Sequence, residues 1–481
     1  MTKMREVDVA VIGAGSAGLV AFGQVRDHTD RAVLIEGGDY GTTCARVGCM
    51  PSKLLIAAAN AAHGARAADR FGVRAGSIEI DGQAVMDRVR RERDRFVRLA
   101  VQAMHRRIDE SMLLRGRARF TDPHVLELED GTRIHAARIV IATGSRSHVV
   151  PALEAAGDRL ATSDEVFDWP GLPGSVALFG PGVIGLELGQ ALARLGVRVR
   201  VFGVGGSVGP IRDPAIRALA MERFREEFPL HPDADVRSIE AGEEGVRIRW
   251  RDGGSAEEET FERLLAATGR RPNVDDLGLE HSGLALDDRG VPVFDRYTMQ
   301  CGDSHVFIAG DVDNDVPLLH EAADEGRIAG ANAGRWPDVR AGLRRCPLSI
   351  VFTEPQIAQV GLGRDEAEAR CGDQLAIGGA SMRNQGRART MGVDCGEIRL
   401  FGQHGNRRFL GAELFGPGME HIAHLLAWAA QQRMTVPDML DMPFYHPVLE
   451  EGLRTALRDL NASLKQTGAP EDECMECGPG T

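Results

Sequence analysis

The sequence lacks a long apolar run. No uninterrupted stretch approaches the ~18 apolar residues that a membrane-spanning helix requires. Residues 1–6 contain no separate apolar signal segment and lead directly into a predicted strand. Positive charge is not in excess either, because the net charge is -13 at pH 7, which disfavours nonspecific binding to nucleic acid. We therefore expect a cytosolic protein that binds neither membranes nor nucleic acid.

Closely spaced cysteines are also few. The eight cysteines lie at positions 44, 49, 301, 346, 371, 395, 474 and 477, and the middle four share no close spacing. Stable structural disulfides are uncommon in the cytosol, so a close pair is more readily explained by redox chemistry. The sequence contains two such pairs, Cys44 with Cys49 and Cys474 with Cys477.

The sequence contains glycine-rich turns that directly follow predicted apolar strands. Residues 7–12 predict a buried strand, Gly13-Ala-Gly15-Ser-Ala-Gly18 follows, and a second predicted strand at residues 31–36 ends in Glu36. Such a turn brings backbone amides and a helix amino terminus to a pyrophosphate, and the acid accepts hydrogen bonds from a ribose. With strand, helix and acid in register, the pattern is strong evidence for a dinucleotide site.

The pattern recurs in the middle of the chain. A predicted strand at residues 175–179 is followed by Gly180-Pro-Gly182-Val-Ile-Gly185, a predicted helix at residues 186–195 and a strand at residues 197–202. Here Gly203 stands where the ribose-binding acid is expected. The repeat predicts a second dinucleotide.

The missing acid leaves the choice of nucleotide open. Without a carboxylate at position 203, Arg198, Arg200 and Arg212 are candidates for binding the 2′-phosphate of NADPH. The alternative is that these arginines are only solvated. The sequence leans slightly towards NADPH and does not decide between the two.

The pair Cys44 and Cys49 follows the first glycine-rich turn closely. On an ideal helix, residues five apart have Cα atoms roughly 8–9 Å apart, whereas a disulfide needs about 4.4–6.8 Å. Bridging the pair requires a distorted first turn, which Gly48 permits. Two unpaired cysteines at a helix start are the alternative, but a neighbouring flavin site favours a redox dithiol.

Five further segments carry a resemblance to a known family. They are Ala142-Thr-Gly-Ser145, the run from Ala267 to Asn273, Ile308-Ala-Gly-Asp311, the run from Val351 to Gly361, and His446-Pro-Val-Leu-Glu-Glu451. With the motifs above, they make the chain resemble, from residue 7 to about 464, the flavin-dependent pyridine nucleotide–disulfide oxidoreductases. This family includes dihydrolipoamide dehydrogenase, glutathione reductase and mercuric reductase. Met50-Pro-Ser-Lys53 and His446 are closest to the dihydrolipoamide dehydrogenase type.

The resemblance implies a mechanism. Cys49 would lie against the flavin as a thiolate and Cys44 would exchange with the substrate disulfide. His446, oriented by Glu451, would be the acid–base group and would act on the opposite subunit of a homodimer. Lys53 and Glu187 would form an ion pair beside the flavin.

The resemblance also implies the cofactors, FAD at the first turn and NAD(P) at the second. The cofactor-binding residues that it predicts are Gly13, Gly15, Ser16, Gly18, Glu36, Gly41, Thr43, Lys53, Thr143, Gly144, Gly180, Gly182, Gly185, Glu187, Arg200, Gly269, Arg271, Gly310 and Asp311. No metal site is predicted. Three departures from the family pattern, Arg46, Tyr445 and Gly203, leave the substrate and nucleotide open.

The predicted fold is α/β, with two Rossmann-like dinucleotide-binding domains and an α+β dimerisation domain. We expect the FAD-binding domain at residues 1–147 and 272–342, the NAD(P)-binding domain at 148–271 and the interface domain at 343–465. The predicted substrate is a small disulfide or dithiol, such as lipoamide, or a small redox protein. Whether the chain serves a 2-oxoacid dehydrogenase complex is open.

Residues 466–481 form a polar, acidic tail that contains Cys474-Met-Glu-Cys477. Three interpretations stay open: a second dithiol that relays electrons in an NADPH-dependent disulfide or metal-ion reductase, half of a metal site, or an inert or docking tail. A low-turnover flavoprotein redox sensor is an alternative of another class, although a sensor has no need of His446 and Glu451.

Overall fold

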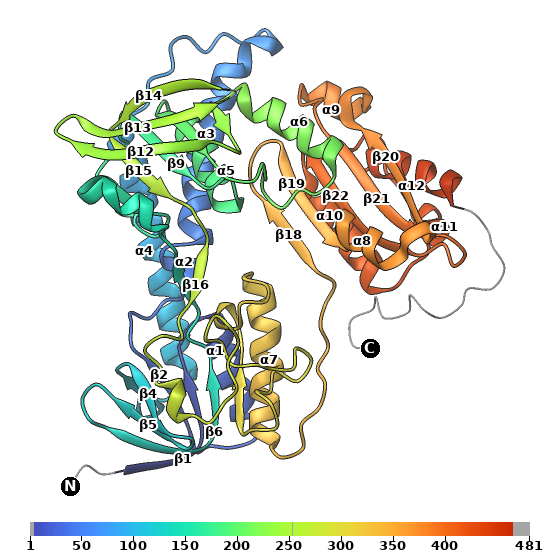
Figure 1. Cartoon of the computed structure of the whole chain (residues 1–481). Helices are drawn as coiled ribbons and strands as arrows, with labels where there is room; N and C mark the ends of the chain where they lie inside the picture. Colours follow the sequence, from blue (N-terminus) through green and yellow to red (C-terminus); the bar gives the residue numbers. More distant parts are fainter. Residues whose placement is uncertain (1–3, 253, 465–481) are drawn as a thin grey trace.

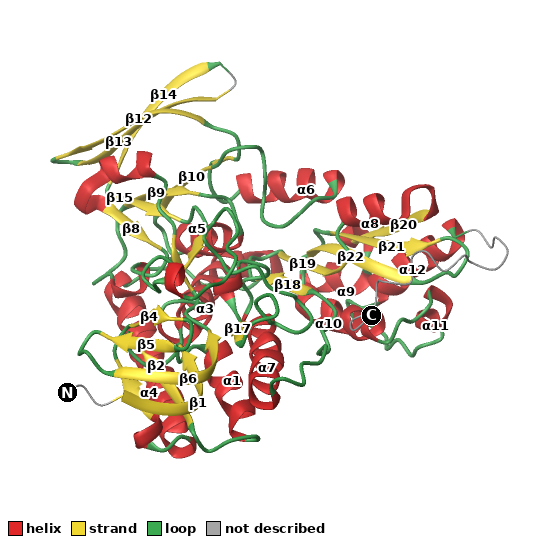
Figure 2. Ribbon diagram, turned by 60° about the horizontal axis from the view of Figure 1, so that its bottom comes forward, coloured by secondary structure: helices red, strands yellow, loops and turns green. Residues whose placement is uncertain are grey.

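The computed structural model describes residues 4–252 and 254–464. Figure 1 shows three parts: a lower part around a seven-stranded sheet, an upper part with a five-stranded parallel sheet, and a right-hand part around a five-stranded antiparallel sheet. The chain starts in the lower part, passes through the upper part, returns to the lower part and ends in the right-hand part. Helices pack against all three (Figure 2). The predicted α/β fold is confirmed.

The lower sheet has the order β3-β2-β1-β6, and β5 and β17 pair with opposite ends of β6. β17 returns to this sheet after the whole upper part has been built, which makes the lower part discontinuous in sequence. The elements are β1 (Met4–Ile12), β2 (Ala32–Glu36), β3 (Leu113–Arg115), β4 (Ala118–Asp122), β5 (Val125–Leu128), β6 (Arg133–Ile141), β17 (Val306–Ile308), α1 (Ser16–Arg26), α2 (Thr43–Arg46), α3 (Cys49–Arg66), α4 (Gly82–Arg107) and α7 (Leu319–Arg335).

Strand β1 is buried on both faces, as expected for the centre of a parallel sheet. Its alternate residues enter two different hydrophobic clusters: Ala10 and Ile12 pack on one face, and Val9 and Val11 on the other with α1 and α7. This two-sided burial explains why the strand reads as a continuous apolar run in the sequence.

The upper part repeats the parallel design with the strand order β11-β10-β9-β15-β8. A two-stranded pair, β7 with β16, lies where the chain enters and leaves this part. The elements are β7 (Ser145–Ser147), β8 (Leu160–Thr162), β9 (Ser175–Phe179), β10 (Arg198–Phe202), β11 (Leu230–His231), β12 (Asp235–Gly242), β13 (Gly245–Asp252), β14 (Ser255–Phe261), β15 (Arg263–Ala266), β16 (Arg270–Pro272), α5 (Val183–Arg194) and α6 (Pro214–Arg225).

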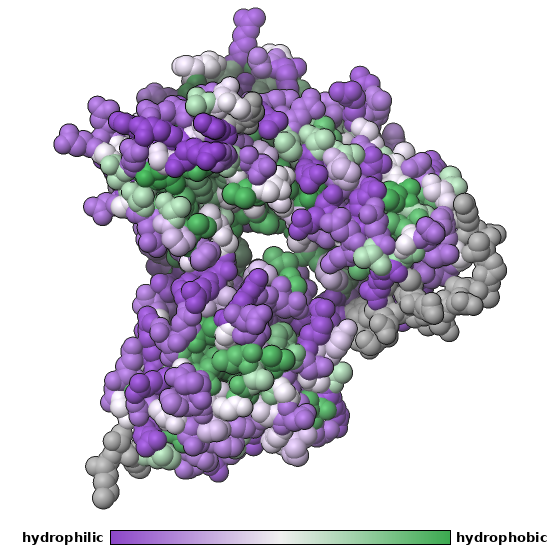
Figure 3. Space-filling model, viewed as in Figure 1, coloured by the Kyte–Doolittle hydropathy of each residue, from purple (hydrophilic) through white to green (hydrophobic). Residues whose placement is uncertain are grey.

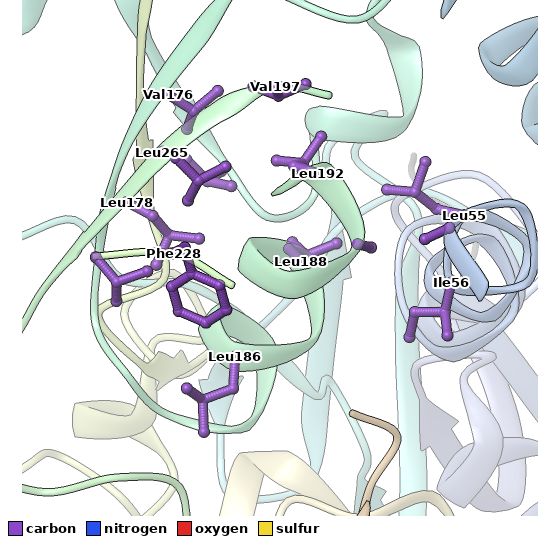
Figure 4. Packing of buried hydrophobic residues seen from close by; sticks show 14 of the residues in the cluster. Leu55, Ile56, Val176, Leu178, Leu186, Leu188, Leu192, Val197, Phe228 and Leu265 are labelled. Carbon is purple, nitrogen blue, oxygen red and sulfur yellow. The ribbon is translucent and has the colours of Figure 1, made fainter. Parts of the chain in front are cut away.

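Helix α5 joins the upper sheet to the lower part. Leu188 and Leu192 belong to the same buried cluster as Val176 of β9 and Leu55 of α3, and Figure 4 shows this packing. Because α3 begins at Cys49, the cluster sets the position of the helix on which the dithiol depends.

The right-hand part has the strand order β18-β19-β22-β21-β20. Helices α10 and α12 share one hydrophobic cluster with the sheet, and α8 contributes to another. The elements are β18 (Leu348–Val351), β19 (Gln356–Gly361), β20 (Leu375–Ser381), β21 (Glu397–Gln403), β22 (Phe409–Gly416), α8 (Arg364–Cys371), α9 (Gly386–Met391), α10 (Met419–Gln431), α11 (Val436–Leu440) and α12 (Glu451–Ser463).

Within the described residues, no helix is both long enough and apolar enough to cross a membrane. The boundaries predicted for the domains stay predictions, although the return of β17 to the lower sheet and the β7–β16 pair agree with their order.

Helices α1 and α7 pack unusually closely because glycines face alanines between them. A Cβ atom on Gly326 would overlap the carbonyl oxygen of Ala17, and one on Gly330 would overlap that of Ala21. The close approach fixes α1, whose amino terminus carries the first glycine-rich turn.

We therefore expect Gly330→Ala to destabilise the protein by about 1–3 kcal/mol, because the added methyl group forces the two helices apart. The measurement is Tm by calorimetry at a fixed heating rate. Gly23→Ala is the matched control, since Gly23 lies on α1 with open space around it and its replacement should leave Tm unchanged or slightly raised. Equal Tm values for the two variants would contradict the proposed close packing.

Candidate active site

The pair Cys44 and Cys49 lies at a break between two helices. α2 ends at Arg46 and α3 begins at Cys49, so the chain between them is not regular helix. A Cβ atom on Gly48 would lie 3.2 Å from the Cα atom of Cys44, which means that the turn closes tightly around this glycine. Both cysteines are free thiols in this structure, and their side chains are hydrogen-bonded to each other. The sequence prediction of a distorted turn at Gly48 agrees with this geometry.

The two thiols differ in their affinity for a proton. The pKa of Cys49 is lowered to about 7, mainly because Cys44 donates a hydrogen bond to its sulfur, and the Lys53 ammonium lowers it further. The pKa of Cys44 is raised, because its thiol proton is held in that same hydrogen bond and because the side chain is partly buried. Cys49 is also the first residue of α3, where the helix dipole favours a thiolate. Near neutral pH the pair therefore shares one proton, which is held by Cys44.

Lys53 lies one helical turn after Cys49 and is paired with a buried acid. Its Nζ donates to Glu187 Oε2 at 2.8 Å and to Oε1 at 3.0 Å, and Glu187 is 4% exposed. The Phe352 backbone N–H also donates to Glu187 Oε1, at 2.9 Å, and the Phe352 ring lies 4.6 Å from the ammonium. The structure brings together the ion pair that the resemblance implied, and it adds Phe352, which lies in the run from Val351 to Gly361 but had been given no role.

The first glycine-rich turn has the shape that a pyrophosphate requires. Gly13 has φ +106°, and a Cβ atom on Gly18 would overlap the Gly13 carbonyl oxygen, so both positions require glycine. Gly15, immediately before Ser16 at the start of α1, has nothing within 4 Å of its missing Cβ, which leaves the turn open on that side. At the end of β2, Glu36 accepts a hydrogen bond from Ala14 N–H at 2.7 Å. These residues fit FAD.

The second turn repeats this geometry. Gly180 has φ +106°, a Cβ atom on Gly185 would overlap the Gly180 carbonyl oxygen, and Gly182 has open space around it. Beside it lies a cavity of about 1210 Å³ between the upper and lower parts, lined by Gly180, Gly182, Gly203 and Asp311 among others. Figure 3 shows the surface hollowed between these parts. The residues fit a nicotinamide dinucleotide.

Three polar side chains that line this cavity are joined by hydrogen bonds. Ser145 Oγ donates to Asp311 Oδ2 at 2.8 Å and accepts from Arg270 Nε at 2.8 Å. Asp311 and Gly310 lie directly after β17, in the lower part. Arg270, rather than the predicted Arg271, lines the cavity, whereas Arg271 pairs with Asp275 at 2.6 Å.

The other residues predicted at the flavin site lie at turns. Thr143 Oγ1 donates to the Asn273 carbonyl oxygen at 2.8 Å, and the Gly144 carbonyl oxygen accepts from Asn273 N–H at 2.9 Å. Gly41 and Gly269 have φ of +121° and +105°. Thr43 begins α2, immediately before Cys44.

Two arginines proposed for a 2′-phosphate are engaged elsewhere. Arg200 Nε donates to Glu259 Oε2 at 2.7 Å, and its guanidinium lies 4.9 Å from the Trp250 ring. Arg198 also pairs with Glu259. Neither arginine is among the described residues that line the cavity, whereas Arg237 is. Glu259 belongs to β14, a strand too distant in sequence for the motif analysis to connect with β10.

His446 and Glu451 form a pair at the start of α12. The carboxylate oxygens of Glu451 lie 3.0 and 3.1 Å from His446 Nδ1, which lowers the pKa of Glu451 and leaves Nε2 directed away from the pair. The His446 side chain is 80% exposed. Within the described residues no hydrogen bond or ion pair joins His446 to Cys44 or Cys49, and α12 lies in the right-hand part, away from α2 (Figure 1).

Comparison with known proteins identifies the family. The family model for pyridine nucleotide-disulphide oxidoreductases matches residues 7–326, and the model for the dimerisation domain of the same family matches residues 348–457. The chain belongs to the pyridine nucleotide–disulfide oxidoreductases. It is an oxidoreductase of this family, and FAD and NAD(P) are its cofactors.

Relatives within the family cover nearly the whole chain. Dihydrolipoyl dehydrogenase 2 of Haloarcula marismortui is 30% identical over 465 residues, which is 93% of this chain and 95% of that protein. A mercuric reductase of Shigella flexneri is 31% identical over 468 residues, which is 95% of this chain and 81% of that protein. The solved structure of LpdA from Mycobacterium tuberculosis superposes with a TM-score of 0.80 at 25% identity, over 94% of this chain and 99% of that one.

We predict that the reduced pyridine nucleotide–disulfide oxidoreductase is alkylated at Cys49 with a midpoint near pH 7, as its lowered pKa requires. Below that pH Cys49 is protonated and slow to react, and above it the thiolate reacts. Cys44→Ala should move the midpoint upward, because the hydrogen-bond donor is lost. The measurement is the rate of iodoacetamide labelling at each pH, located by mass spectrometry.

Cys346→Ala is the control, because the pKa of this remote thiol is raised to about 11 by burial and it makes no contribution to the labelling at neutral pH. A midpoint near the ordinary pKa of a cysteine thiol in the parent protein would show that the assigned thiolate is wrong.

Proposed function

We propose that the protein transfers electrons between NAD(P)H and a small dithiol or disulfide of the lipoamide class, as a cytosolic homodimer with Cys44 and Cys49 as its redox pair. The observation that carries the proposal is the pair of free thiols at the break between α2 and α3, with the Lys53–Glu187 ion pair one helical turn beyond Cys49. The dihydrolipoyl dehydrogenases among the relatives support this substrate class. FAD supplies the acceptor and donor of an electron pair between the dithiol and the nicotinamide.

In the direction of dithiol oxidation, His446 removes a proton from one substrate thiol, and Glu451 stabilises the imidazolium that results. The substrate thiolate attacks the Cys44 sulfur of the oxidised pair, the bond between Cys44 and Cys49 breaks, and Cys49 leaves as a thiolate. The second substrate thiol attacks the first substrate sulfur, and its proton passes to Cys44, which is released as a thiol. The substrate leaves as a disulfide, and the first proton stays on His446.

Cys49 is suited to be the leaving group because its pKa is the lower of the two. Cys44 is suited to be the attacked sulfur, because its raised pKa keeps the proton on it once the pair is reduced. His446 is exposed in this chain, and a dimerisation domain is present, so we assign His446 to the dithiol of the partner subunit.

The first test is anaerobic turnover of oxidised lipoamide with NADH and with NADPH. We expect rapid turnover by the parent protein and none by Cys44→Ser, because the exchanging sulfur is lost. Reduction of ferricyanide is the control, since it needs the flavin and nucleotide sites but not the dithiol, and the variant should retain it. Flavin reduction without lipoamide turnover in the parent protein would instead support another disulfide substrate or a sensor.

The assignment of His446 to the partner subunit has its own test. Cys44→Ser and His446→Gln homodimers should both be inactive with lipoamide. A heterodimer with one variant chain of each kind should recover activity, because one of its two sites then contains both parent side chains. Differently tagged chains allow the heterodimer to be purified. An inactive heterodimer would place His446 and the dithiol of one site in the same chain.

A second candidate function concerns Cys474 and Cys477, which lie outside the described residues. Mercuric reductases are among the relatives, and a second dithiol is suited to relay electrons to a metal ion or a large disulfide. Under this proposal, replacing Cys474 and Cys477 by Ser abolishes turnover of such a substrate and leaves lipoamide turnover unchanged. Normal turnover of Hg²⁺ and of a protein disulfide by both forms would exclude the relay.

A further inference from the structure

The two nucleotide turns differ at one matched pair of positions. In the first, Ala14 follows Gly13, and its N–H donates to Glu36 at the end of β2, at 2.7 Å. In the second, Pro181 follows Gly180, and Gly203 stands at the end of β10. Proline has no N–H to donate, and glycine has no carboxylate to accept. The donor and the acceptor of the first site are therefore both absent from the second.

Packing explains why the two changes occur together. A Cβ atom on Gly203 would lie 2.5 Å from Pro181 Cγ and 2.6 Å from its Cδ, and 2.8 Å from the carbonyl oxygen of Pro232. The Gly203 backbone cannot move away, because its N–H donates to His231 O at 2.8 Å and its carbonyl oxygen accepts from Ala234 N–H at 2.9 Å. While Pro181 is present, no side chain fits at position 203.

The two acids near this end of the cavity, Asp233 and Asp235, are both engaged within the protein, by Gly205 N–H and by Arg237. Gly203 is followed by Val204, Gly205 and Gly206, which carry no charge and of which Val204 is 86% exposed. Gly205 N–H is held by Asp233 at 2.8 Å, which fixes the uncharged loop in place. The residues directly after Gly203 therefore offer a ribose backbone groups and an apolar side chain, and no carboxylate.

Two of the three arginines that the sequence offered for a 2′-phosphate are held by a carboxylate instead. Arg198 and Arg200 are both paired with Glu259. Arg237 lines the cavity, but it is paired with Asp235, so any attraction for a phosphate is offset by a neighbouring carboxylate. Across the described residues that line this cavity, the charges of the two signs are thus balanced.

We propose that the contact between Pro181 and Gly203 determines nucleotide specificity by making the adenosine end of the second site indifferent to the 2′-phosphate. The protein then uses NADH and NADPH with comparable efficiency. The inference rests on the proposed function and adds the nucleotide that the site accepts. A carboxylate on the ribose hydroxyls would favour the unphosphorylated nucleotide by roughly 10- to 100-fold, the usual range for hydrogen bonds to a charged group. It would also repel a 2′-phosphate.

The test measures binding rather than turnover. ADP-ribose and 2′-phospho-ADP-ribose are titrated into the oxidised holoenzyme by calorimetry, because neither contains a nicotinamide and no electron transfer interferes. We expect the two Kd values of the parent protein to agree within about tenfold. A preference above about 100-fold for either ligand would overturn the proposal.

The main test variant gives the second turn the two residues of the first turn that form the hydrogen bond. Pro181→Ala combined with Gly203→Glu recreates the Ala14 and Glu36 pair and should shift the ratio of Kd values towards ADP-ribose by roughly 10- to 100-fold. Pro181→Ala combined with Gly203→Gln is the matched control, with the same size and no charge, and should shift the ratio much less. An unchanged ratio in a Glu variant with the parent flavin spectrum and Tm would overturn the proposal.

The single variants test the steric part. Gly203→Glu alone should lower Tm, because Pro181 occupies the space that its Cβ needs, and adding Pro181→Ala should restore part of the loss, since the Pro232 carbonyl oxygen still lies 2.8 Å from that Cβ. A single variant as stable as the parent protein would show that the contact does not exclude a side chain.

Failure of the proposed function is separable from failure of this inference. If neither NADH nor NADPH bleaches the flavin of the parent protein, the proposed function fails. If the flavin is bleached but the Kd ratio is strongly skewed, only the inference on specificity fails.

Discussion

The buried carboxylate of Glu187 is the group on which the rest of the site depends. An ionised carboxylate inside a protein requires partners for its charge and its lone pairs, and removing a partner costs about 3–5 kcal/mol. Glu187 has Lys53 from α3 and the Phe352 N–H from the segment after β18. These partners come from α3 and from the right-hand part, while Glu187 itself belongs to α5 of the upper part (Figure 1). One charge therefore requires α3, α5 and the segment after β18 to be in register.

The same face of α5 repeats this arrangement along its length. Gln190 and Arg194 follow Glu187 at helical spacing and both contact the backbone of Glu354. Arg194 also donates to Asn60 Oδ1 of α3 at 2.8 Å. The leucines of α5 face the apolar core, so the helix has one apolar and one polar face, and both are buried. A buried polar face is stable only because each group on it is hydrogen-bonded.

The contacts that Glu187, Gln190 and Arg194 make with α3 and with the segment after β18 form a buried junction. This junction affects the chemistry of the dithiol, because Lys53 is the partner of Glu187 and also lowers the pKa of Cys49. It lies four residues after Cys49 on α3, and its charge lowers the pKa of that thiol. If the junction opened, the ammonium would be free to turn towards solvent and Cys49 would lose part of its stabilisation as a thiolate. The proposed redox activity and the packing of the three parts are thus one arrangement rather than two.

Local features of the site could be predicted from the sequence, and features that join distant strands could not. Both glycine-rich turns, with their strands and helices, follow from the positions of Gly13 and Gly180 and their apolar neighbours, since a tight turn needs only nearby residues. The start of α4 is a feature that the motifs do not report, because it is set by Asp81, which caps the helix by accepting a hydrogen bond from Ala84 N–H at 2.9 Å. Such a cap lies outside an apolar periodicity.

The role of Arg200 is the opposite case. Its position on β10 suggested a phosphate ligand, but its partner Glu259 comes from β14, 59 residues later. Phe352 could not be found either, because its backbone N–H carries the interaction with Glu187 and no side-chain pattern reports it. His446 and Glu451 are close in sequence and were found together, whereas their place beside α12 in the right-hand part, apart from α2, needed the structure (Figure 1).

Gly203 shows how a single absence can be read in two ways. The sequence indicates only that an acid is missing at position 203. From the sequence, the nearby arginines could be interpreted as ligands for the 2′-phosphate of NADPH. The structure supplies a cause that lies on another segment: the ring of Pro181 fills the space that the acid would need. Since Ala14 and Glu36 preserve the donor and acceptor in the first turn, the two halves of one chain provide both forms of the same site. Under the proposed function, the first turn holds its dinucleotide by one more hydrogen-bonded contact than the second. That difference suits a cofactor that stays bound in the first site and a nucleotide that must leave the second in every catalytic cycle.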